Sequence, residues 1–272
     1  MGAKLSNKAK PANKRKDEAR RILGDIAKTY DSAFVDGDPV RFVHHFESRE
    51  DREVVALLSA LLAFGNVKSI HASVAKVLEI AGPSPSEFAR AFDADALAPR
   101  FAALGHRWVR GADLVKLFDV MRYLILRFGS LQEAFLAHHR PSDPHVGPML
   151  ERFSLDVFSR LHKPALSRGF RYFFPSPADG SPCKRLCMFL RWMARPADGI
   201  DLGLWPGLSA SKLVIPLDTH VYRFARRFRL SPYKNPRWDV AVHVTEFLKE
   251  IEPSDPVRFD FSICHYGMDV GW

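Results

Sequence analysis

Cysteine is scarce in this chain, and long apolar runs are missing. Three cysteines in 272 residues cannot form the disulfide framework of a small secreted domain, which indicates a reducing compartment. The longest apolar run, from Val54 to Gly65, is shorter than the ~18 residues that a membrane-spanning helix needs. No apolar stretch follows the basic N-terminus, so it does not resemble a secretory signal. We therefore expect a cytoplasmic protein that does not enter a membrane.

Several motifs that identify common enzymes and metal sites are also missing. The sequence has no glycine-rich phosphate loop, no His-Glu-x-x-His and no Cys-x-x-Cys. Cys183 and Cys187 lie four residues apart and Cys264 is distant, whereas an iron–sulfur cluster needs four thiolates. We expect the three cysteines to be ordinary thiols of the interior. Accordingly we expect no metal and no cofactor.

Positive charge is present in excess but is unevenly placed. The chain has 40 Lys and Arg against 31 Asp and Glu, a net charge of +9. Residues 1–16 hold six of these cations and no acid, so the remainder carries only +3. The basic tail is either a solvated arm or an arm that binds phosphates. We expect residues 1–16 to be disordered and residues 17–272 to form the folded domain.

The hydrophobic pattern of this domain predicts almost only helices. Residues 53–64 are apolar nearly all round, which is typical of a helix in the middle of a bundle. The apolar spacing predicts further helices at 67–80, 113–128, 131–138, 149–161, 184–194, 219–228, 237–250 and 257–268. Residues 170–174 fit either a short strand or an aromatic loop. The expected fold is all-α, a helical bundle of two lobes with a cleft between them.

One segment of interest runs from Asp179 to Met193, with the sequence DGSPCKRLCMFLRWM. A glycine turn that opens a helix exposes backbone N–H groups, which can bind a phosphate. Lys184 falls in the first turn of this predicted helix, where the helix dipole disfavours a cation. A functional lysine is one interpretation of this placement, and an ordinary exposed lysine is the other.

A second segment of interest runs from Ile215 to Phe228, with the sequence IPLDTHVYRFARRF. Asp218 has the position of an N-cap, where a carboxylate accepts hydrogen bonds from backbone N–H groups. It is either only a cap or a carboxylate that also faces a ligand. Arg223, Arg226 and Arg227 are spaced to share a helix face, which is either a phosphate-binding stripe or a solvated surface.

Both segments resemble the helix-hairpin-helix DNA glycosylases, the endonuclease III superfamily. PLDTHVYRFARRF is similar to the segment that holds their catalytic aspartate, and DGSPCKRLCMFLRWM is similar to the hairpin and second helix of their DNA-binding motif. Gly180 takes the place of the first hairpin glycine, and Lys184 that of the Schiff-base lysine of bifunctional members. Lys184 followed by Phe189-Leu190-Arg191 most resembles the archaeal-type 8-oxoguanine glycosylases.

A longer resemblance, from about Tyr30 to Asp269, links the chain to a family of bacterial proteins known only as a domain of unknown function. KRLCMFLRWM, DGIDLGLW and IPLDTHV are similar to its signature stretches. Two features depart from the glycosylase superfamily. Pro182 replaces the second hairpin glycine and cannot donate a backbone N–H to phosphate. Lys184 and Asp218 are 34 residues apart, about twice the usual separation, because residues 195–212 are inserted.

The superfamily resemblance implies a DNA repair N-glycosylase, with or without AP-lyase activity. Such an enzyme extrudes a damaged base, here an oxidised purine, from double-stranded DNA. Lys184 would attack the sugar as a neutral amine, and Asp218 would stabilise the positive charge that develops there. We expect DNA contacts from Gly180, Ser181, Arg185, Arg191, His220, Arg223, Arg226 and Arg227, and a base pocket that contains Trp192 and Trp205. The expected enzyme is monomeric and associated with the nucleoid.

Two alternatives belong to other functional classes. A non-catalytic nucleic-acid-binding module on the same fold would explain Pro182 and the insertion. An interaction domain, or an enzyme for an unrelated small molecule, would use Lys184, Asp201 and Asp218 as the lining of an ordinary pocket. DNA binding without base release would favour the first alternative, and a lack of DNA binding at low salt would favour the second.

Overall fold

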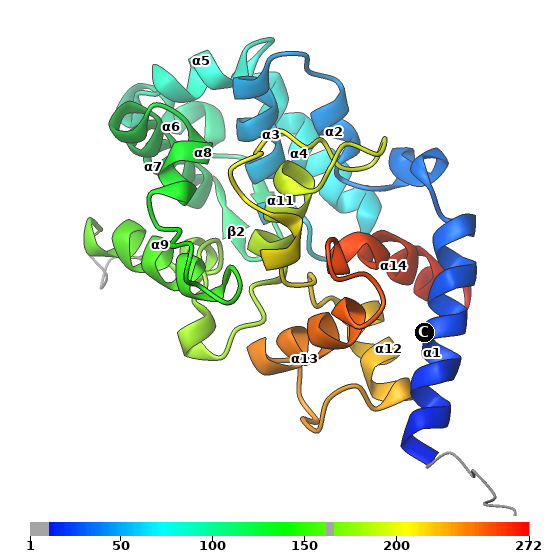
Figure 1. Cartoon of the computed structure of the whole chain (residues 1–272). Helices are drawn as coiled ribbons and strands as arrows, with labels where there is room; N and C mark the ends of the chain where they lie inside the picture. The colour runs from blue at the N-terminus through cyan, green and yellow to red at the C-terminus, as the bar shows by residue number, and fades with distance from the viewer. Residues whose placement is uncertain (1–10, 162–165, 272) are drawn as a thin grey trace, which may run out of the picture.

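Helices form nearly all of the regular structure in the computed structural model, which describes residues 11–161 and 166–271 (Figure 1). In chain order, with η for 3₁₀ helices, the elements are α1 (Pro11–Thr29), η1 (Ser32–Gly37), α2 (Arg41–His44), α3 (Arg49–Leu62), α4 (Val67–Ala81), α5 (Pro85–Arg90), α6 (Ala94–Phe101), β1 (Gly105–His106), β2 (Val109–Arg110), α7 (Gly111–Phe128), α8 (Leu131–Leu136), α9 (Gly147–Ser159), α10 (Arg168–Arg171), η3 (Pro177–Asp179), α11 (Lys184–Ala194), η4 (Ala210–Lys212), α12 (Thr219–Phe228), α13 (Trp238–Lys249), η5 (Pro256–Phe259) and α14 (Asp260–Asp269).

The all-α prediction is confirmed, and the predicted helices with strong apolar periodicity appear within a few residues of their expected bounds. The described residues add one short hairpin, in which β1 and β2 pair antiparallel with Gly105 opposite Arg110. Residues 170–174 are not a strand, because they form the end of α10 and the turn that follows it. The helix predicted at 257–268 is divided into η5 and α14.

The basic N-terminal segment is shorter than expected. Helix α1 begins at Pro11, so the prediction of disorder is wrong for residues 11–16, whereas residues 1–10 lie outside the described part of the chain. Ala19 and Leu23 on α1 are fully buried, and the helix packs on α14. Lys16 and Arg20 both form ion pairs with Glu250, at 3.2 and 2.6 Å. Apolar burial and these pairs extend the helix into the predicted tail.

Two groups of helices are arranged around α11 (Figure 1). Helices α3 to α9 lie on one side, and α1, α12, α13 and α14 lie on the other. Helix α11 packs against α3, whose residues from Val54 to Leu62 are all buried, as the apolar run predicted. This central position of α11 places its first turn between the two groups.

The inserted segment 195–212 packs against α3 and α11 through residues around Trp205. Trp205 is fully buried, and its Nε1 donates to the Glu53 carboxylate of α3 at 2.9 Å. The backbone N–H groups of Leu202 and Trp205 donate to the carbonyls of Trp192 and Met193, both at 2.8 Å. The insertion therefore covers the C-terminal half of α11 and leaves its N-terminal turn accessible.

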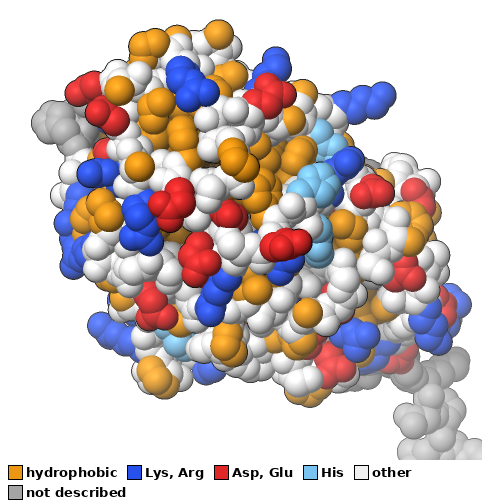
Figure 2. Space-filling view, turned by 90° about the horizontal axis from the view of Figure 1, so that it is seen from above, with side chains coloured by type: hydrophobic (Ala, Val, Ile, Leu, Met, Phe, Trp, Pro, Cys, Tyr) orange, Lys and Arg blue, Asp and Glu red, His pale blue; other side chains and the backbone are white. Residues whose placement is uncertain are grey.

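The surface charge is mixed on the face seen from above. Figure 2 shows Lys and Arg interspersed with Asp and Glu there, beside a group of histidines and a strip of hydrophobic side chains. The excess positive charge of the sequence is thus not gathered on this face. In residues 11–161 and 166–271, no helix combines the length and apolar character that a membrane crossing requires.

Candidate functional site

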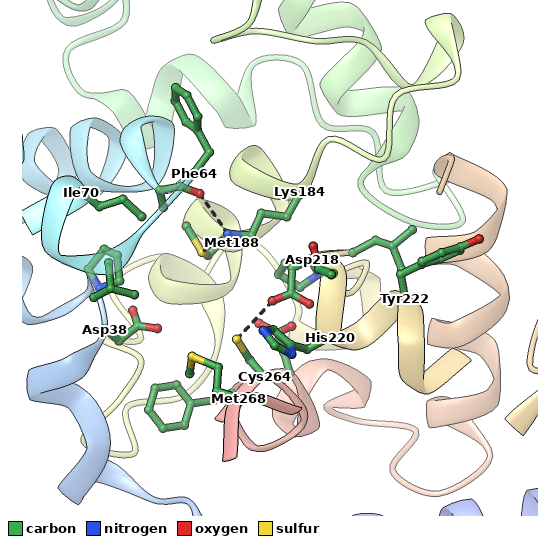
Figure 3. Close-up of a pocket in the computed structure, with 18 of the residues that line it drawn as sticks. Asp38, Phe64, Ile70, Lys184, Met188, Asp218, His220, Tyr222, Cys264 and Met268 are labelled. Atoms are coloured by element: carbon green, nitrogen blue, oxygen red, sulfur yellow. Dashed lines mark hydrogen bonds between the residues drawn. The ribbon is translucent and has the colours of Figure 1, made fainter. Parts of the chain in front are cut away.

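A cavity of about 500 Å³ lies where the two groups of helices meet. Most of its lining comes from five segments: the connection from η1 to α2, the turn from α3 to α4, one face of α11, the start of α12, and α14. Tyr172 and Pro236 complete it. Figure 3 shows side chains from these segments around the cavity. The lining includes Asp38, Phe64, Ile70, Tyr172, Pro182, Lys184, Met188, Arg191, Asp218, His220, Tyr222, Asp260, Phe261, Cys264 and Met268.

Helix α11 presents Lys184, Met188 and Arg191 to the cavity. Their spacing of four and three residues places them on one helix face. The Lys184 amino group donates to the carbonyl oxygen of Ala63 at 3.2 Å and lies 3.5 Å from the sulfur of Met188. The lysine is thereby held at the α3–α4 turn with its amino group beside the cavity (Figure 3).

The backbone before Lys184 forms a tight turn, as the glycine predicted. Gly180 has a φ of 75°, and Cys183, the N-cap of α11, has a φ of 47°. The side chain of Cys183 makes no capping hydrogen bond to the helix. Ser181 instead accepts the backbone N–H of Cys183 at 3.2 Å. Pro182 lines the cavity, whereas Gly180 and Ser181 precede it on the chain and are not part of the lining.

Asp218 is both a helix cap and a cavity residue. One carboxylate oxygen accepts the Val221 N–H at 2.7 Å, which confirms the predicted N-cap. The other oxygen accepts the thiol proton of Cys264 at 3.1 Å (Figure 3). Burial and the neighbouring carboxylates raise the pKa of Cys264 well above its usual value, so it stays a thiol donor. The two interpretations of Asp218 as cap and as cavity carboxylate are therefore compatible.

Asp260 is a second acid of the cavity, and sequence reasoning missed it. The residue is 6% exposed, and its carboxylate accepts a hydrogen bond from the Arg191 guanidinium at 2.7 Å. Burial raises the pKa of Asp260 to about 7, Arg191 and Lys184 oppose this rise, and Asp218 adds to it. A carboxyl with this pKa exchanges a proton at neutral pH. The only local signal was a charged residue between two phenylalanines, which is a weak one.

His220 occupies the junction of α12 and α14. It lines the cavity in the first turn of α12, and its ring lies directly against Gly267 of α14. A Cβ at Gly267 would lie 2.6 Å from Nδ1 of His220, so only glycine permits this approach. The close contact fixes how α14 presents Asp260 and Cys264 to the same space as Asp218.

The two residues predicted as catalytic thus line one cavity, although 34 positions separate them. The insertion between them folds against α11 and does not separate Lys184 from Asp218. His220, which was predicted to contact DNA, also lies at this cavity. The cavity combines the Lys184 amine, the carboxyl groups of Asp38, Asp218 and Asp260, and apolar walls. Such groups can support nucleophilic attack by an amine with proton transfer nearby.

Two predicted DNA contacts, Arg185 and Arg191, are corrected because both arginines are buried. Arg185 donates to the carbonyls of Leu61, at 3.0 Å, and Tyr172, and burial lowers its pKa to about 10. Arg191 lies at the cavity wall but is committed to ion pairs with Asp260 at 2.7 Å and Asp201 at 3.2 Å. Both side chains hold protein segments together, so they are not available to a DNA backbone at the surface.

The predicted base pocket at Trp192 and Trp205 is likewise corrected. Both indoles are fully buried, and neither lines the cavity. The ring of Trp205 packs at 5.1 Å from Phe189, and its N–H is bonded to Glu53. These tryptophans belong to the hydrophobic core because the insertion folds over α11, which the helical pattern alone did not reveal.

The predicted basic stripe of α12 is exposed but lies outside the cavity. Arg223, Arg226 and Arg227 are exposed, whereas Phe224 and Phe228 on the opposite face are buried. This arrangement agrees with both interpretations of the stripe, a solvated face or a phosphate-binding one.

Comparisons with known proteins identify one family. No curated protein and no solved structure matches the chain. One family model, described as a protein of unknown function (DUF2400), matches residues 38–269. That match includes Asp38, Lys184, Asp218 and Asp260 and extends over most of the chain. The chain therefore belongs to the DUF2400 family.

Proposed function

We propose that this protein is a DNA N-glycosylase with an associated AP-lyase activity. Its substrate would be double-stranded DNA with a damaged base, and an oxidised purine is the base we propose first. The protein would act at the nucleoid. The observation that carries this proposal is the convergence of Lys184 and Asp218 on one cavity from distant segments. The resemblance of both segments to helix-hairpin-helix glycosylases is consistent with it.

The proposed reaction requires the Lys184 ammonium to give one proton to a carboxylate of the cavity, after which the amine attacks C1′ of an extruded nucleotide. The N–C1′ bond forms as the bond from C1′ to the base breaks, and the base leaves with the electron pair. The Asp218 carboxylate faces the positive charge that develops on the sugar. Asp260, whose pKa is about 7, supplies a proton to the departing base. The nitrogen then loses a proton as the C1′–O4′ bond opens and O4′ takes up a proton, which gives an imine. The Asp260 carboxylate left by the first step removes a proton from C2′ as the C3′–O bond breaks and the 3′ phosphate leaves.

Borohydride trapping tests this proposal directly, since reduction converts the imine into a stable amine link. We expect wild-type protein to form a covalent adduct with an oligonucleotide duplex that contains an abasic site or a damaged base. Lys184→Ala should abolish the adduct, and Lys76→Ala, at an exposed lysine on α4, should leave it unchanged. Asp218→Asn keeps a capping side chain, so it should fold but react slowly.

One observation favours the non-catalytic alternative. The Lys184 amino group is already engaged by the Ala63 carbonyl, so a purely structural lysine would have the same contact. A binding module would show salt-dependent affinity for DNA without base release or adduct. Absence of an adduct across abasic and damaged duplexes, with retained DNA binding, would replace the glycosylase proposal by this alternative.

A further inference from the structure

Three aromatic side chains meet at the rim of the cavity, and we call Phe64, Trp108 and Tyr172 the aromatic platform. Phe64 and Tyr172 also line the cavity, whereas Trp108 lies in the tight turn between β1 and β2. Phe64 stacks on Trp108 with ring centroids 4.9 Å apart. Tyr172 packs edge-on against both rings, at 5.1 Å from each. The platform is thus continuous with the cavity wall.

The platform is supported from the protein side. The buried guanidinium of Arg185 lies 3.5 Å from the centre of the Tyr172 ring and 5.3 Å from that of Phe64. His106 packs at 4.6 Å from Phe64 and contacts its carbonyl oxygen through Nε2 at 2.7 Å. These contacts hold the rings in place, yet Tyr172 remains 37% exposed. A rigid, partly exposed aromatic surface is suited to stacking against a planar ligand.

Two arginines flank the platform. The guanidinium groups of Arg107 and Arg168 lie 5.1 and 5.8 Å from the Trp108 ring. Both residues are exposed, and neither forms an ion pair with another of the described residues. Their charges are therefore available to an anion at the cavity rim.

The backbone also shapes this surface. Arg107 adopts a φ of 56°, a left-handed conformation that is unfavourable for a residue with a side chain. Its side chain lies over Gly65, where a Cβ would be only 3.0 Å from Cδ of Arg107. The left-handed backbone of Arg107 and the lack of a side chain at Gly65 together place the Arg107 side chain beside Phe64 at the cavity mouth.

We propose that the aromatic platform and its two arginines form a nucleic-acid contact surface beside the cavity. Tyr172 stacks on an unpaired base next to the extruded nucleotide, while Arg107 and Arg168 contact flanking phosphates. Aromatic rings stack on the faces of all bases, and arginines without acidic partners match the phosphate charge. The inference rests on the proposed function for its substrate, but it concerns a surface separate from Lys184 and Asp218.

Equilibrium binding to a labelled DNA duplex tests the platform. The duplex carries a reduced abasic site, which cannot react with an amine, so affinity is measured without chemistry. Tyr172→Ala should weaken binding about tenfold, equivalent to about 1.4 kcal/mol, whereas Tyr172→Phe should bind like wild type. Arg107→Ala should lower the slope of log affinity against log salt by about one, as expected for one lost phosphate contact.

Arg127→Ala provides a matched control. Arg127 is also exposed and lies over two aromatic rings, 5.8 Å from Tyr123 and 4.9 Å from Phe128, but on α7 and outside the cavity. Its replacement should leave both affinity and salt slope unchanged. Because Tyr172→Ala removes a ring that covers Arg185, its melting temperature is measured too. If Tyr172→Ala is unfolded, the DNA affinity and salt slope of a double variant, with alanine at the exposed Arg107 and Arg168, test the platform instead.

The outcomes separate this inference from the proposed function. If Tyr172→Ala and the double arginine variant keep the wild-type affinity and salt slope, the platform does not contact DNA and this inference is overturned. The same result is expected if the surface binds a protein partner instead. Lack of DNA binding by the wild type would overturn both proposals. Weakened binding by the platform variants, together with absence of any borohydride adduct in the wild type, would retain the platform and overturn only the glycosylase chemistry.

Discussion

The Arg191 guanidinium of α11 binds the Asp260 carboxylate of α14 at 2.7 Å and also lies 3.2 Å from Asp201 of the insertion. All three side chains are buried. One arginine therefore joins the central helix, the inserted segment and the last helix at the wall of the cavity. Removal of one partner would leave a buried charge uncompensated, which makes the pair sensitive to both mutation and pH.

The first prediction concerns the pH dependence of stability that Asp260 causes. Its pKa is about 7 in the folded protein, against ~3.9 for an unperturbed aspartate. Between these values the unfolded chain releases a proton that the folded protein keeps, so unfolding becomes easier as pH rises. The loss of stability that Asp260 causes is absent below about pH 4 and reaches its full size above about pH 7. We expect the melting temperature of Asp260→Asn to fall less than that of wild type over this range.

Thermal melting in matched buffers measures this difference. Asp119→Asn, at an exposed carboxylate on α7, should follow the wild-type curve and serves as the control. Other buried acids, such as Glu53, also have a raised pKa, so the difference between wild type and variant is the quantity that matters. Parallel curves for wild type and Asp260→Asn would contradict the raised pKa.

The second prediction distinguishes a structural Trp205 from a base-binding one. Trp205→Phe removes the N–H that donates to Oε1 of the buried Glu53, whose nearest remaining cation is Arg49 at 3.5 Å, while Oε2 keeps the Gln132 N–H. An unsatisfied buried group costs about 1–3 kcal/mol, so urea denaturation should show a loss of this size. Affinity for the abasic duplex should not change, because the indole is outside the cavity. Reduced DNA affinity with unchanged stability would restore the earlier assignment to a base pocket.

The order of helices was accessible from the sequence because apolar periodicity records which face of a helix is buried. Asp218 was accessible for a related reason, since it stands at a helix start where capping chemistry is local. Lys184 was singled out by its place in the first turn of a helix and by the resemblance to the glycosylases, not by capping. Asp260 was not accessible in this way. Its role depends on Arg191, which lies 69 positions away, and no local pattern specifies that pairing.

The misassigned residues share one physical cause. Arg185, Arg191, Trp192 and Trp205 have side chains that can serve either a ligand or the interior. For Arg191, Trp192 and Trp205 the insertion favours the interior, because Asp201 pairs with Arg191 and the segment around Trp205 covers α11. Arg185 is buried instead by its bonds to the carbonyls of Leu61 and Tyr172. The aromatic platform was missed because its three rings come from three distant segments, and the aromatic run at 170–174 alone does not show that Tyr172 meets Phe64 and Trp108.

The third prediction concerns the contact between α12 and α14. In Gly267→Ala the new methyl group would lie 2.6 Å from Nδ1 of His220, and neither helix has room to accept it without shifting. Overpacking of this kind costs about 1–3 kcal/mol, which urea denaturation would reveal. Because His220 follows Asp218 by two residues, the shift should also weaken the hydrogen bond from Cys264 and slow adduct formation.

Gly24→Ala is the matched substitution for this test. Gly24 lies inside α1, and a Cβ there would meet no atom within 4 Å. Alanine loses less conformational freedom than glycine on folding, so this variant should be more stable by about 0.4–1 kcal/mol and react at the wild-type rate. Opposite effects of the same substitution at the two positions would show that the helix contact, and not glycine content, sets the geometry around Asp218. Equal stability and equal adduct rates in both variants would contradict a tight junction of α12 and α14.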